Sequence, residues 1–189
     1  MAPEPQIQSD PSPWVTRFSG LARSPVLDLA CGSGRHAEFF AAHGFDVIAL
    51  DRDLSRLRHL GDHPQITAIQ ADLETEDAPW RPAPGSIGTL VVTNYLHRPL
   101  MPALVDALKP GGVLIYETFA LGNEALGKPS NPDFLLRPGE LLDAVRGQLT
   151  VIAYEHGKVT EPRPAIIQRI CAVQASPSLA SSWPLDSSA

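Results

Sequence analysis

Short apolar runs alternate with segments of helical spacing along most of this chain. Seven runs have the length and the apolar, often β-branched, composition of buried strands: residues 25–30, 45–50, 66–70, 89–93, 112–117, 149–154 and 165–173. Three segments between them are spaced as amphipathic helices: residues 34–43, 54–60 and 100–108. Because strands and helices alternate, the pattern predicts right-handed βαβ units and a mostly parallel sheet.

The last two runs depart from this alternation. Only residues 155–164 join them, and this polar stretch is too short for a crossover helix, so we expect the two runs to pair antiparallel. The predicted fold class is α/β, a doubly wound Rossmann-like sheet of about seven strands, mostly parallel, with an antiparallel C-terminal hairpin. We expect one domain over residues 14–174, between a flexible N-terminal arm at 1–13 and a disordered tail at 175–189.

Composition excludes several classes of function. A chain of 189 residues with 43% hydrophobic and 19% charged residues is globular and has the size of a single domain. Its formal net charge of −6 opposes a phosphate backbone, so we expect no nucleic-acid partner. Cys31 and Cys171 fit neither a zinc spacing nor a disulfide framework, and we see no signal peptide or membrane span. We therefore expect a cytoplasmic monomer or homodimer without a metal.

Residues 26–36, VLDLACGSGRH, carry the most specific pattern in the chain. A strand runs into a Gly-x-Gly turn that opens a helix. Gly32 and Gly34 allow a tight turn and a close approach of the backbone to a ligand. The free N–H groups of the helix N-terminus lie at the same place, beyond the carboxyl ends of the strands. The segment therefore predicts a ligand site at this edge of the sheet.

The same turn also fits a dinucleotide site, because Gly32, Gly34 and Ala37 satisfy the G-x-G-x-x-G/A pattern. Two features oppose that interpretation. Asp28, just before the turn, would repel a pyrophosphate but would suit a cationic sulfonium ligand that carries an amino group. The antiparallel closing hairpin is likewise not part of the plain dinucleotide fold.

Two further acids follow the second and third strands. Asp51 ends the second strand, where a carboxylate can accept both ribose hydroxyls, as an acid also does in NAD sites. Asp72 follows the third strand and is suited to an adenine amino group, with Leu73 packing on the ring. Each acid alone is more simply a helix cap or turn residue. Three acids after three successive strands, together with the turn, favour a nucleoside ligand with a cationic end.

Four segments resemble the motifs of class I S-adenosylmethionine-dependent methyltransferases, in the order and spacing of that family. They are LDLACGSG at residues 27–34, ALD ending at Asp51, QADLE around Asp72, and LKPGGVLI at residues 108–115. The resemblance covers residues 14–173. Within the family, the chain is similar to small single-domain bacterial enzymes, including tellurite-resistance methyltransferases. One departure lies at residues 87–89, where such enzymes usually have an aromatic residue followed by Asp; we expect it to affect only the entry into the fourth strand.

The resemblance implies a seven-stranded sheet whose last strand is antiparallel, with S-adenosylmethionine as cofactor and methyl donor. Carried over by position, Asp28, Gly32 and Gly34 would line the methionine end of the donor, Asp51 the ribose and Asp72 the adenine. The other candidates for the donor site are their neighbours and the residue after the fourth strand: Ala30, Arg52, Leu73 and Asn94.

Methyl transfer from a sulfonium is an in-line displacement, so we expect the acceptor above the ends of the fourth and fifth strands. Asn94 and Tyr95 follow the fourth strand, beside the expected methyl group, and His97 or Tyr95 is a candidate catalytic base. Arg98 is suited to an anionic acceptor. Alternatively, Asn94 and His97 cap the helix that begins at Pro99.

The fifth strand ends near Glu117, which is either a third candidate acid or base, or a partner for Arg98. Residues 120–133 then form a long irregular stretch where a lid over the acceptor would lie. Within it, Asn123 and Asn131 are candidates to bind a polar acceptor, unless the stretch is an ordered surface loop.

The sequence therefore predicts a methyltransferase that acts on a small-molecule acceptor of unidentified structure. A small molecule is favoured over RNA or protein because the chain has no extra domain, basic stripe or aromatic RNA-binding motif. Two alternatives stay open. The formal glycine match allows a nicotinamide-dependent oxidoreductase, and a non-catalytic module that binds S-adenosylmethionine would carry the same motifs.

Overall fold

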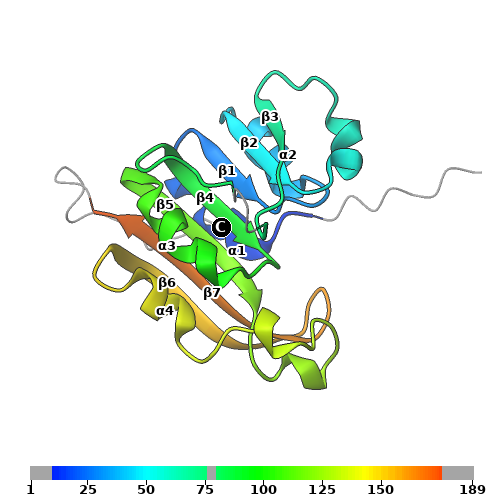
Figure 1. The fold of residues 1–189 in the computed structure, drawn as a ribbon, viewed down its shortest axis with the longest axis vertical. Coiled ribbons are helices and arrows are strands. Elements are labelled where there is room, and N and C mark those ends of the chain that lie inside the picture. Colours follow the sequence, from blue (N-terminus) through cyan, green and yellow to red (C-terminus); the bar gives the residue numbers. More distant parts are fainter. Residues whose placement is uncertain (1–9, 76–79, 176–189) are drawn as a thin grey trace, which may run out of the picture.

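A seven-stranded sheet forms the centre of the molecule in the computed structural model, which describes residues 10–75 and 80–175 (Figure 1). Its strands follow the order β3-β2-β1-β4-β5-β7-β6. They are β1 (Val26–Leu29), β2 (Val47–Asp51), β3 (Ile66–Gln70), β4 (Ile87–Thr93), β5 (Leu108–Phe119), β6 (Leu149–Val159) and β7 (Ala165–Gln174). Strand β7 runs antiparallel to both of its neighbours, β5 and β6, whereas β1 to β5 pair in parallel. The predicted fold class and closing hairpin are therefore confirmed.

Short helices connect the strands. The α-helices are α1 (Pro13–Phe18), α2 (Arg35–Ala42), α3 (Met101–Asp106) and α4 (Glu140–Val145), and the 3-10 helices are η1 (Ser19–Leu21), η2 (Leu54–Leu60), η3 (Arg98–Leu100), η4 (Asn123–Ala125) and η5 (Pro132–Phe134). The segment expected to be a helix at residues 54–60 is thus helical, but as a 3-10 helix. Sequence patterns did not predict α1 or α4, which are six residues long each.

The two faces of the sheet are covered by different helices (Figure 1). On one face, Val91 of β4 packs in a cluster with residues of α1 and α2, including Trp14 and Phe40. On the other face, the neighbouring Leu90 and Val92 pack in a cluster with residues of α3 and α4. This alternation along one strand is what a doubly wound sheet requires, because successive side chains point to opposite faces.

The chain passes unusually close to the start of β4. A Cβ atom on Gly88 would lie 2.4 Å from the carbonyl oxygen of Arg23 and 2.5 Å from that of Ser24. Thr89 fixes this crossing, since its hydroxyl donates to the Arg23 carbonyl at 3.0 Å and accepts from the Arg23 amide at 2.7 Å. Only glycine therefore fits at position 88 beside the crossing backbone, which explains the departure of this segment from the enzymes that it resembles.

The expected N-terminal arm falls mainly outside the described residues, as does most of the expected tail at 175–189. Of the arm's described part, Ser12 is buried and Pro13 begins α1, so this part packs on the sheet. Among residues 10–75 and 80–175, no helix is long and apolar enough to cross a membrane.

Candidate functional site

The turn between β1 and α2 has a backbone that few residues tolerate. Ala30, Gly32 and Gly34 all have left-handed conformations, with φ of 52°, 58° and 77°. A Cβ atom on Gly34 would also lie 2.7 Å from Cδ2 of Leu57, which is buried in η2. The amide of Cys31 donates to the carbonyl of Leu50 at 3.0 Å, so the turn is held against the neighbouring strand β2.

The residues expected to bind the donor gather along the carboxyl ends of four adjacent strands, β3, β2, β1 and β4. In the strand register, Leu29 pairs with Leu50 on one side and Val92 on the other, and Asp51 pairs with Gln70. The sheet therefore brings the predicted set to one edge: Asp28, Ala30, Gly32, Gly34, Asp51, Arg52, Asp72, Leu73 and Asn94.

Asp51 is the acid most closely tied to the turn. Its Oδ2 accepts a hydrogen bond from the Gly32 amide at 2.8 Å, and its Oδ1 accepts one from the Asp53 amide at 3.0 Å. The residue stays half-buried, so the carboxylate keeps accepting capacity toward the site. Asp72 lies nearby, because the amide of Ala71 donates to the Asp51 carbonyl at 3.0 Å.

Asp72 itself is exposed and accepts a hydrogen bond from the Glu74 amide at 2.9 Å, while Leu73 is only 5% exposed. Arg52 is exposed, and its carbonyl accepts from the Gln70 side chain at 3.0 Å. The carboxylate of Asp72 therefore stabilises a turn and is also accessible to solvent. Its predicted contact with adenine stays a prediction.

The Asp28 carboxylate faces the first turn of α2 and not the open edge of the sheet. The residue is 1% exposed, and its Oδ2 accepts from the Ala37 amide at 3.0 Å while Oδ1 lies 3.9 Å from Nδ1 of His36. Burial raises the pKa of Asp28 to about 7, against the lowering effects of the Ala37 amide and Arg35. The predicted contact of Asp28 with the donor's amino group is thus not supported, because the first turn of α2 covers its carboxylate.

The segment after β4 holds the predicted catalytic residues Tyr95 and His97. Burial, reinforced by the carboxylates of Glu74 and Asp72, raises the pKa of Tyr95 above its usual range, which disfavours Tyr95 as a base. The His97 side chain does not cap η3, and it makes no hydrogen bond to another described residue. Of these two residues, His97 therefore stays the candidate base.

Arg98 is engaged inside the protein. Its Nε and Nη2 donate to the two carboxylate oxygens of Glu140 at 2.6 and 3.0 Å, and the guanidinium also donates to the carbonyls of Asp133 and Leu135 at 2.6 and 2.8 Å. The alternative in which Arg98 pairs with Glu117 is therefore wrong. Arg98 instead fixes the segment after β5, which leaves it poorly placed to hold an anionic acceptor.

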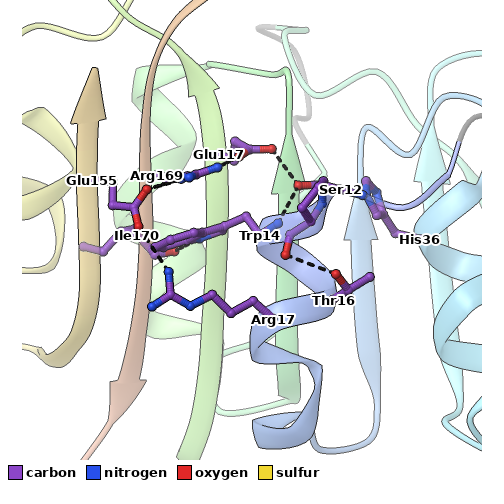
Figure 2. Close-up of polar contacts among 10 residues, drawn as sticks. Ser12, Trp14, Thr16, Arg17, His36, Glu117, Glu155, Arg169 and Ile170 are labelled. Atoms are coloured by element: carbon purple, nitrogen blue, oxygen red, sulfur yellow. Dashed lines mark hydrogen bonds and ion pairs between the residues drawn. The ribbon is translucent and has the colours of Figure 1, made fainter. Parts of the chain in front are cut away.

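Glu117 belongs to a different network, on the face covered by α1 (Figure 2). Its Oε1 accepts from the Ser12 hydroxyl at 2.7 Å, and its Oε2 accepts from Nη1 of Arg169 at 3.3 Å. Arg169 also pairs with Glu155, and its guanidinium carbon lies 4.7 Å from the centre of the Trp14 ring. Sequence patterns did not associate Ser12 or Arg169 with Glu117, since the contacts span 105 and 52 residues.

The stretch after β5 is an ordered loop. Asn123 is buried, donates to the Pro129 carbonyl at 3.0 Å and accepts from the Ile166 amide at 3.2 Å. Asn131 accepts from the Asp133 amide at 3.0 Å and so caps η5. Both predicted acceptor-binding amides are therefore used by local backbone, in favour of the alternative of an ordered surface loop.

No group of three or more His, Cys, Asp and Glu side chains suited to a metal ion occurs within residues 10–75 and 80–175. The two cysteines are free and buried. Burial, with Asp28 and Asp51 nearby, raises the pKa of Cys31 above its usual range, so its thiol is not activated as a nucleophile.

Known proteins share this arrangement. Residues 26–112 match the family model described as a methyltransferase domain. Trans-aconitate 2-methyltransferase of Paracidovorax citrulli (strain AAC00-1) is 35% identical over 109 residues, which make up 53% of this chain and 40% of that protein. The chain therefore spans less than half the length of this curated relative.

Solved structures match over more of the chain. An S-adenosylmethionine-dependent methyltransferase from Mesorhizobium loti has a TM-score of 0.68 at 19% identity, over 85% of this chain and 95% of the other. TehB from Haemophilus influenzae has a TM-score of 0.64 at 18% identity, over 85% of this chain and 61% of the other. Residues 26–112 are therefore similar to a methyltransferase domain, and the strand order is that of the fold these S-adenosylmethionine-dependent methyltransferases share.

Proposed function

We propose that this protein transfers a methyl group from S-adenosylmethionine to a small-molecule acceptor. The observation that carries the proposal is the hydrogen bond of 2.8 Å between the Gly32 amide and Asp51. This hydrogen bond joins the glycine turn to the half-buried carboxylate of Asp51 on the adjacent strand. Gly34 in that turn has a positive φ and little space for a Cβ atom. A nucleoside with two ribose hydroxyls fits that pair, since a carboxylate can accept two hydrogen bonds from neighbouring hydroxyls.

Each residue at the edge has a task in this proposal. Asp51 orients the ribose, Asp72 accepts from the adenine amino group, and Leu73 packs beneath the ring. S-adenosylmethionine supplies a methyl group that its sulfonium already activates. The protein therefore mainly aligns donor and acceptor and excludes water, with Asn94 at the end of β4 forming the floor below the transferred group.

His97 is our candidate for the base when the acceptor carries a proton. The proposal prefers it to Glu117, whose two oxygens are held by Ser12 and Arg169, and to Tyr95, whose pKa is raised. Since Arg98 is paired with Glu140, the site does not favour an acceptor with several negative charges, such as the one named for the trans-aconitate enzyme. We further propose a cytoplasmic monomer or homodimer that binds no nucleic acid.

The oxidoreductase alternative is less well supported. The closing strand β7 is antiparallel, and Asp28 is buried against α2 just before the turn. Because burial raises the pKa of Asp28 to about 7, this carboxyl is only partly ionised at neutral pH, and the antiparallel strand carries most of this argument.

Calorimetric titration with S-adenosylhomocysteine, with NAD as the control ligand, tests the proposal. We expect micromolar binding of the first ligand and none of the second. An acceptor screen that measures release of S-adenosylhomocysteine then tests for turnover. Binding of NAD alone would refute the proposal, and tight donor binding without turnover across a broad panel would support a non-catalytic module instead.

A further inference from the structure

The segment before α1 crosses from the glycine turn to the end of β5. At one end, the Arg35 side chain donates to the Asp10 carbonyl at 3.0 Å. At the other end, Ser12 is 4% exposed and contacts both α2 and β5. The described part of the N-terminal segment therefore lies against the edge of the sheet where the donor is proposed to bind.

Ser12 uses every polar group that it has. Its amide donates to Nε2 of His36 at 3.1 Å, and its hydroxyl donates to Oε1 of Glu117 at 2.7 Å (Figure 2). The same hydroxyl accepts from the Trp14 amide at 3.1 Å and so caps α1, and the Ser12 carbonyl accepts from the Thr16 amide at 3.0 Å. One buried residue thus ties α1, α2 and β5 together.

Both partners of Ser12 adjoin the proposed donor site. His36 is in the first turn of α2, two residues after Gly34. Glu117 lies opposite Thr93 in the strand register, and its carbonyl accepts from the Asn94 amide at 2.9 Å. A displacement of Ser12 would therefore release contacts on two sides of the site at once.

We propose that residues Asp10–Ser12 form a strap that closes the methionine end of the donor site, and that Ser12 is the positioning residue that latches it. This inference rests on the proposed function, because the strap retains a donor bound at the Gly32–Asp51 edge. When Ser12 leaves Glu117, the strap loosens and the donor dissociates faster.

The closing experiment measures the dissociation rate of S-adenosylhomocysteine from the full-length protein by stopped flow. Ser12→Asp is the decisive variant. Aspartate caps a helix as well as serine does, but its carboxylate cannot donate to Glu117 and is repelled by it. We expect dissociation on the order of tenfold faster for Ser12→Asp and for Ser12→Ala, the effect of losing one hydrogen bond. Thr16→Ala, an exposed change in the same helix, is the control and leaves the rate unchanged.

Several outcomes would overturn the strap. If Ser12 only stabilises the fold, both variants keep the wild-type dissociation rate, whatever they lose in stability. Amide hydrogen exchange of the wild-type protein gives an independent result, even if a variant does not fold. Slower exchange over residues 10–16 with bound S-adenosylhomocysteine supports the strap, and unchanged exchange refutes it. Failure of the wild-type protein to bind that ligand removes the proposed function, whereas unchanged rates in a protein that does bind remove only the strap.

Discussion

The amide of Gly32 and the carboxylate of Asp51 form a hydrogen bond of 2.8 Å that links two strand ends. The glycine turn follows β1, and Asp51 ends the neighbouring strand β2. Asp51 therefore holds the shape of the turn in addition to its proposed contact with ribose, so both effects are expected to appear when it is changed.

Asp51→Ala is expected to weaken binding of S-adenosylhomocysteine by about 1–3 kcal/mol, because the ribose hydroxyls and the Gly32 amide lose their acceptor. Calorimetric titration measures the change. Asp46→Ala, which removes an exposed acid just before the opposite end of β2, is the matched control and should leave affinity as it is. Equal affinities for wild type and a folded Asp51→Ala variant would remove Asp51 from the site.

Gly88→Ala tests whether the crossing of the chain over β4 excludes a side chain. The added Cβ would meet two carbonyl oxygens of the backbone, which cannot turn away as the end of a side chain can. We expect a loss of about 1–3 kcal/mol in the free energy of unfolding, measured with urea. Gly157→Ala is the control, because that glycine is also in a strand but an added Cβ atom would meet no other atom within 4 Å, and it should change stability by less than about 0.5 kcal/mol.

Sequence patterns predicted the parts of this protein that depend on neighbours along the chain. The short connection at residues 155–164 predicted the antiparallel pairing of β6 with β7, which the structure confirms. The acids at the ends of successive strands were found because parallel strands present their carboxyl ends at one edge. The direction of a side chain was harder to predict, as Asp28 demonstrates, since it faces α2 instead of the open edge.

Contacts between distant residues left no pattern in the sequence. Arg98 pairs with Glu140 across 42 residues, and Ser12 bonds Glu117 across 105. In each case the fold decides which carboxylate a polar group meets, so the sequence offered several partners and no reason to choose. The predictions for Arg98 and Glu117 suffered most from this, because the role of each residue depends on which side chains it already contacts in the fold.

Arg98→Ala is expected to lower the free energy of unfolding by about 1.5–3 kcal/mol, since it leaves two carbonyls without this donor and leaves Glu140 with only its contacts to Arg137. Urea unfolding at neutral pH measures the loss. Arg137→Ala serves as the control, because Arg137 contacts the same carboxylate at 3.4 Å but its side chain is 70% exposed. A loss from Arg137→Ala as large as that from Arg98→Ala would contradict the assigned anchoring role.

The ion pair between Arg98 and Glu140 also makes the stability of the protein depend on pH. Burial alone would raise the pKa of Glu140, but hydrogen bonds from Arg98 and from the Arg137 amide lower it from 4.5 to about 2. The stabilisation is therefore present above pH 4.5 and is lost as the pH falls toward 2. In Arg98→Ala the difference in stability from wild type should shrink as the pH is lowered through this range.

His36 and Asp28 carry opposite pH dependences. Burial, followed by Arg35, lowers the pKa of His36 from 6.5 to about 3, so its contribution to stability is present above pH 6.5 and is lost as the pH falls toward 3. Burial raises the pKa of Asp28 from 3.8 to about 7, so its contribution is present below pH 3.8 and is lost as the pH rises toward 7. In the window between, the two groups change stability in opposite directions as the pH changes.

Removing one of these two groups should therefore reveal how the other one changes the free energy of unfolding with pH. In His36→Gln, the free energy of unfolding relative to wild type should fall as the pH rises from 4 to 6.5, because Asp28 must ionise in an apolar site. In Asp28→Asn it should fall in the reverse direction, as the pH drops over the same window, because His36 resists its proton. Urea unfolding at half-unit steps of pH measures both slopes, with His43→Gln, an exposed histidine at the C-terminal end of α2, as the control. Slopes of the same sign in the two variants would contradict the raised pKa of Asp28.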